Sequence, residues 1–183
     1  MPQRVEETAS ALIRLADDAR ARFGHLGEAQ LNWRPAPEQW SIAQCFEHLI
    51  TIQSDYLPKL EELADASRTP SFWERVSPLS GMFGRMLIRS LDPSNTRKSK
   101  AVARSLPPSS DIDAQVIERF HAHQNELASH LRALPTSLDP TKVVITSPLL
   151  GFVTYSLDDC MTIFVIHGRR HFAQAERVLA AMS

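Results

Sequence analysis

The chain has 183 residues, of which 43% are hydrophobic and 22% charged, and its net charge at pH 7 is −1. This composition predicts one domain, residues 1–183, with a sizeable core. The near balance of basic and acidic residues argues against nucleic acid as a partner. No apolar stretch is long enough to span a bilayer, and the polar N-terminus shows no signal peptide, so we expect no membrane partner either.

Apolar residues recur at helical spacing in four stretches, which predicts four main helices. The stretches contain Val5, Ala9, Leu12, Ala16, Ala19 and Phe23; Ile42, Cys45, Leu49, Ile52, Tyr56 and Leu63; Ile112, Val116, Phe120, Leu127, Leu131 and Leu134; and Leu157, Phe164, His167, His171, Ala175 and Val178. We expect the first helix to end near Gly24, Pro58 to kink the second, and Pro135 to close the third.

The start of the second helix has a clear signature. Ser41 followed by Gln44 forms a capping box, and Trp40 in front of it is placed to staple onto Cys45. Ser156 followed by Asp159 predicts a second capping box at the start of the fourth helix.

The connections between the helices differ in length. Residues 66–110 form a long connection, in which "FGRMLIRSL" predicts a short helix, and "KVVITS" is the only strand candidate. Such a connection lets the second and third helices run parallel, whereas the shorter links suit antiparallel neighbours. The chain therefore reads as an all-α four-helix bundle with one crossover.

Histidines on the apolar seams are candidate metal ligands. In "HGRRH", His167 and His171 are four residues apart, so both rings project from one face of the fourth helix. Two such imidazoles can bind one divalent metal ion, and His48 on the second helix is the natural third ligand. The alternative is that each ring is a core histidine bonded to a local partner.

Three further residues lie near this pattern on the sequence. Gly168 opens space near the metal, lets a neighbouring helix approach closely, or serves simple packing. Gln174 could bond a ligand ring from the second coordination shell, or be an ordinary boundary residue. His123, on the seam of the third helix, could be a fourth ligand, a second-shell group or a proton carrier, although a core role is the simpler interpretation.

The two cysteines, Cys45 and Cys160, lie within apolar helical patterns. We expect both to be reduced thiols of the core, which favours a cytoplasmic location. Neither has an obvious activating partner, so neither is expected to act as a nucleophile.

Two segments resemble the signatures of the DinB-like (damage-inducible, YfiT-like) family. "LNWRPAPEQWSIAQCFEHL" is similar to its first signature, a Trp-x-Pro loop followed by a Trp-Ser helix start and a histidine, and "HGRRHFAQAERVL" is similar to its second, a His-x-x-x-His helix followed by glutamine. The resemblance implies an up-down-down-up bundle and a metal site of His48, His167 and His171. It also implies nickel, zinc or iron as the metal, and homodimers are common in the family.

The resemblance also suggests a reaction. Some relatives in the wider superfamily are transferases or isomerases that use low-molecular-weight thiols, although many members have no known reaction. We expect an S-transferase type of enzyme in which a metal-bound thiolate attacks a small electrophilic substrate. The metal could instead activate water for hydrolysis. A metal-binding stress protein without turnover is a further possibility, in which a fourth protein ligand would close the site.

Overall fold

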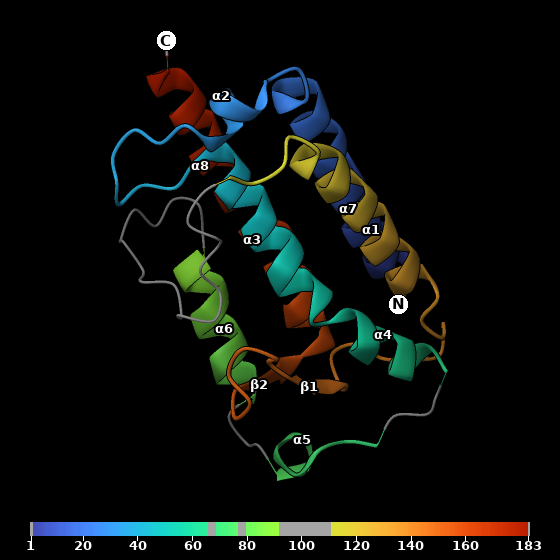
Figure 1. Ribbon diagram of the computed structural model, residues 1–183. Coiled ribbons are helices and arrows are strands. Elements are labelled where there is room, and N and C mark those ends of the chain that lie inside the picture. The colour runs from blue at the N-terminus through green and yellow to red at the C-terminus, as the bar shows by residue number, and fades with distance from the viewer. Residues whose placement is uncertain (1, 66–68, 77–79, 92–110, 183) are drawn as a thin grey trace.

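The computed structural model describes residues 2–65, 69–76, 80–91 and 111–182 (Figure 1). In chain order the elements are α1 (Pro2–Phe23), α2 (Glu28–Asn32), α3 (Ile42–Ser54), α4 (Leu57–Ala64), α5 (Phe72–Val76), α6 (Ser80–Leu91), α7 (Val116–Arg132), β1 (Val144–Thr146), β2 (Thr154–Ser156) and α8 (Leu157–Ala181). The protein is mostly helical, which confirms the predicted all-α class.

The four long helices pack in a closed ring. α1 lies against α7 and α8, and α3 also lies against α7 and α8. The relative directions of these helices follow from polar contacts that show which part of each helix lies beside which part of its neighbour. These contacts are Arg4–Asp158 and Arg22–Glu176 between α1 and α8, Arg20–Glu118 and Arg132–Glu6 between α1 and α7, and Arg119–Glu47 and Gln124–Gln53 between α3 and α7. Helices α1 and α8 therefore run in one direction, and α3 and α7 run in the other, as Figure 1 shows.

The predicted second helix is two helices in the structure. α3 ends at Ser54 and α4 begins at Leu57, with Pro58 in its first turn. A proline has no backbone N–H and its ring collides with the carbonyl four residues earlier, here that of Ser54, so the helix stops instead of bending. The expectation of one kinked helix was wrong, although Tyr56, Leu60 and Leu63 are buried and continue the apolar face.

The long connection between α4 and α7 contains two described helices. The predicted "FGRMLIRSL" helix is the C-terminal part of α6, which packs against α8 and β2. The short helix α5 contacts β1 and was not predicted. Residues 92–110 of the predicted connection lie outside the described residues.

A small antiparallel hairpin precedes α8. Strand β1, within the predicted "KVVITS" segment, pairs with β2 in the register Val144↔Ser156, Ile145↔Tyr155 and Thr146↔Thr154. Strand β2 was not predicted. The hairpin leads directly into Leu157, the first residue of α8.

The bundle interior consists of two apolar clusters. One includes Phe23, Phe46 and Phe120, and the other includes Tyr155 and Phe164. On α8, the last buried residue of the second cluster is Phe164, and the first buried residue that belongs to the other cluster is Ala175. His167 and His171, the predicted ligands on α8, lie between these two residues.

Candidate metal centre

A hydrogen-bonded cap fixes the start of the helix that carries His48. The hydroxyl of Ser41 accepts a hydrogen bond from the Gln44 backbone N–H at 3.1 Å, and the Gln44 side-chain oxygen accepts one from the Ser41 N–H at 2.9 Å. This is the predicted capping box, and it satisfies two backbone donors that the helix cannot satisfy itself. Two turns into α3, His48 points inward and is only 3% exposed.

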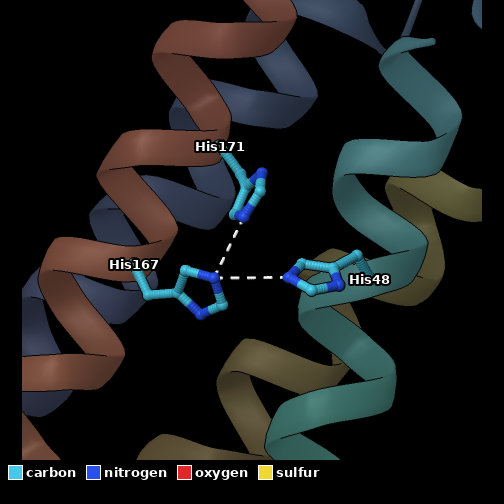
Figure 2. A group of neighbouring side chains, drawn as sticks. All are labelled: His48, His167 and His171. Carbon is cyan, nitrogen blue, oxygen red and sulfur yellow. Dashed lines mark hydrogen bonds between the residues drawn. The ribbon is translucent and has the colours of Figure 1, made fainter. Parts of the chain in front are cut away.

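The other two histidines lie one turn apart on α8. That helix begins with the Ser156 hydroxyl accepting a hydrogen bond from the Asp159 backbone N–H at 3.0 Å. His167 and His171 are 8% and 6% exposed, and both rings face α3. Figure 2 shows the three rings pointing toward one another from the two helices.

The three Nε2 atoms converge on a single point. The Nε2 atom of His167 lies 3.3 Å from Nε2 of His48 and 3.0 Å from Nε2 of His171 (Figure 2). Two nitrogen ligands bonded at about 2.0–2.1 Å to one metal ion lie roughly 2.8–3.4 Å apart, for angles between the octahedral and the tetrahedral value. The observed separations fall within this range, so the three nitrogens could hold one metal ion.

Hydrogen bonding among the rings alone does not account for this arrangement. A neutral imidazole nitrogen either donates one proton or accepts at one lone pair. The Nε2 atom of His167 faces two other ring nitrogens, and it cannot make a good hydrogen bond to both. A cation between the three lone pairs would satisfy all of them at once.

The surroundings keep the two histidine rings on α8 neutral. The pKa of His167 is lowered to about 3, mainly by burial and also by the proximity of His48 and Arg170. Burial also lowers the pKa of His171 well below its usual value, and the neighbouring His167 and His48 act in the same direction. Since a metal binds the unprotonated nitrogen, the lone pairs of His167 and His171 are available at neutral pH.

Trp40 contacts two of the three rings. Its indole stacks on His171 with centroids 5.4 Å apart and planes 12° apart, and it meets His48 edge-on at 4.8 Å. The indole also packs on the core cluster that contains Cys45, the predicted staple partner. The sequence did not predict that Trp40 contacts His48 and His171. Its position directly before the capping box of α3 does place it near the start of the helix that carries His48.

The remaining sequence candidates are not part of the convergent group. His123 is buried on α7, with Nδ1 3.8 Å from a carboxylate oxygen of Glu126, and it does not join the three ligand atoms. Gln174 raises the pKa of His171, but within the described residues Nδ1 of His171 has no hydrogen-bond partner of good geometry. Gly168 faces α1, which supports the close-approach interpretation.

The two cysteines are buried and free, as predicted. Burial raises the pKa of both the Cys45 and the Cys160 thiol far above its usual value. Both therefore stay protonated at neutral pH, and neither is a nucleophile in the folded protein.

Comparisons with known proteins place the chain in a family. Within the described residues, no helix has the length and apolar character needed to cross a bilayer. Neither the curated proteins nor the solved structures give a match to this chain. The sequence model of the DinB superfamily matches residues 11–175, a range that includes α3 and the ligand-bearing part of α8. With its buried histidine triad at the junction of these two helices, the chain belongs to the DinB superfamily.

Proposed function

We propose that this protein binds a divalent transition metal ion, nickel, zinc or iron, through Nε2 of His48, His167 and His171. The observation that carries the proposal is the convergence of three buried nitrogens at separations that suit a common metal. Three imidazoles make an incomplete coordination shell for any of these ions, which leaves positions for a substrate.

We further propose that the protein is an enzyme of the thiol S-transferase type, acting on small electrophiles as a homodimer. When bound, the metal supplies Lewis acidity that favours the thiolate form of a coordinated low-molecular-weight thiol. The protein itself contributes three buried imidazole donors, of which His167 and His171 are held neutral by their burial. Membership of the DinB superfamily supports this class. Within the described residues no cysteine is suited to act as the nucleophile, so the thiol would be a cosubstrate.

The deep burial of the ligands favours a second candidate, a metal-binding protein without turnover. All three rings are less than one-tenth exposed, which suits retention of a metal as well as catalysis. The two candidates differ in whether a small molecule can reach the metal, and this can be measured directly.

Metal analysis tests the site. Purified protein is loaded with nickel, zinc or ferrous iron, passed through a desalting column, and analysed by mass spectrometry for bound metal. Replacing His48, His167 or His171 with alanine should lower retained metal by about tenfold or more, since two imidazoles hold a divalent ion far less firmly than three. His25→Ala, at an exposed position, is the matched control. Full metal content in the triple-alanine variant would contradict the proposal.

A spectroscopic titration tests the thiol. The cobalt-substituted protein is titrated with a low-molecular-weight thiol, and a sulfur-to-cobalt charge-transfer band is expected to appear. Conjugation of the same thiol to small electrophiles is then measured with and without metal. No spectral change at millimolar thiol would favour the protein without turnover over the transferase.

A further inference from the structure

The histidine at position 171 lacks the usual support of a metal ligand. Metal-binding histidines nearly always donate their second ring N–H to a carboxylate, carbonyl or water, which fixes the orientation of the ring. Within the described residues, the buried Nδ1 of His171 has no such partner. Something else must hold the ring with its Nε2 aimed at His167, 3.0 Å away.

The aromatic contacts of His171 show that its imidazole ring is held by the indole of Trp40. The indole of Trp40 is nearly parallel to the imidazole, with planes 12° apart and centroids 5.4 Å apart, the geometry of an offset stack. The same indole meets the ring of His48 edge-on, so one side chain contacts a ligand on each of the two helices.

The position of Trp40 is itself well fixed. The next residue, Ser41, is held by two hydrogen bonds with Gln44 and is 1% exposed. The indole is half-buried and packs against the adjacent core cluster. The loop before α3 therefore presents a rigid aromatic plane to the face of α8.

We infer that Trp40 is a positioning residue of the metal site, which orients His171 by stacking in place of a hydrogen bond to Nδ1. This inference rests on the proposed metal binding by His48, His167 and His171. Its consequence is that metal affinity depends on a flat side chain at position 40, while the fold needs only an apolar one.

The experiment compares Trp40→Leu with Trp40→Phe, because both keep an apolar side chain and only phenylalanine can stack. Cobalt and zinc affinities are measured by competition with a chromophoric chelator, alongside thermal unfolding of the metal-free proteins. We expect Trp40→Leu to weaken metal binding by about tenfold or more, as loss of an outer-shell partner does. Trp40→Phe should retain most of the affinity. Trp33→Leu, at an exposed tryptophan of the same loop, should leave it unchanged.

A second measurement does not involve metal. In the metal-free wild type, carbon-bound ring protons of His171 lie over the indole face and should resonate upfield of their positions in Trp40→Phe and Trp40→Leu. This measurement decides the matter if Trp40→Leu does not fold. The absence of an upfield shift in the wild type would overturn the inference.

The outcomes separate the two proposals. If the wild type binds no metal, the proposed function fails and the inference falls with it. If the wild type binds metal and a folded Trp40→Leu binds it equally well, only the role of Trp40 is overturned. Weakened binding in Trp40→Leu together with recovery in Trp40→Phe supports both.

Discussion

Leu15 of α1 occupies the space in which Gly168 of α8 would carry a side chain. A Cβ atom added at Gly168 would lie 2.5 Å from Cδ2 of Leu15, well inside contact distance. Gly168 lies between the ligands His167 and His171, so α1 packs tightly against the turn of α8 that carries both ligands. The glycine thus lets α1 support the ligand-bearing turn of α8.

This contact predicts a coupling between the two positions. Alanine is favoured over glycine in a helix interior by about 1 kcal/mol, whereas overpacking costs typically 1–3 kcal/mol. In a protein that carries Leu15→Ala the clash is removed. The change in the free energy of unfolding caused by Gly168→Ala should therefore be more favourable there than in the wild type, by at least about 1 kcal/mol. Denaturant unfolding of the wild type, the two single variants and the double variant measures this coupling free energy. Gly151→Ala, with no atom nearby, should show no coupling to Leu15.

Metal binding should stabilise the fold, because the ligands tie α3 to α8. A ligand that binds only the folded state, present at 100 times its dissociation constant, contributes about 2.7 kcal/mol. For a chain of this length that raises the melting temperature by roughly 5–10 °C. Differential scanning fluorimetry with added metal measures the shift, and a chelator should reverse it. A similar shift in His167→Ala would place the stabilising metal elsewhere.

The metal-free protein should lose stability as the pH falls. The pKa of His167 is about 3 in the folded state, against the ordinary value of 6.5 in the unfolded chain. Above pH 6.5 both states hold the ring neutral, so the difference has no effect. Between pH 6.5 and about 3 the unfolded state takes up a proton that the folded state does not, which favours unfolding by about 1.4 kcal/mol per pH unit for this ring.

Burial also lowers the pKa of His171, so this ring adds to the same trend. Urea unfolding at a series of pH values from 7.5 to 4.5 measures it. His167→Gln should reduce the slope, since the glutamine side chain does not titrate. An equal slope in that variant would show that other groups dominate.

A buried amide pair between α3 and α7 predicts a second coupling. The Gln124 side-chain N–H donates to Oε1 of Gln53 at 2.6 Å, while Gln53 Nε2 and Gln124 Oε1 have no partner in the part of the chain that the structure describes. Replacing either residue with leucine leaves the other amide unsatisfied, at a cost of about 1–3 kcal/mol. The double leucine variant should unfold near the wild-type midpoint. Additive losses in chemical unfolding would contradict this account.

Much of the helical framework could be predicted because its signals are local. The apolar period placed Leu12, Phe120 and Leu157 in helices and in the core, as the structure has them. The position of the histidines on the seam of α8 predicted that His167 and His171 face inward, and a third histidine on a capped helix completed the group. Each of these inferences needs only the spacing of residues along one helix.

Other features depend on contacts that no local pattern encodes. The stack of Trp40 on His171 joins a loop to a helix that lies more than a hundred residues further on. The role of Gly168 depends on which helix passes over it, and only the packing of α1 shows that it is Leu15. His123 is buried on α7, as its seam position predicted, and its absence from the group of converging ligand atoms depends on how α7 packs against α1 and α3.

The positions of the ligands along the sequence determine at which stage of translation the metal site can form. His48 and His167 are separated by 119 residues along the chain, yet their Nε2 atoms lie 3.3 Å apart. A nascent polypeptide on the ribosome has His48 long before α8 emerges, so for most of translation only one of the three ligand residues has been made. The complete metal site can therefore form only after the chain has been made through His171 and after α3 and α8 have come together.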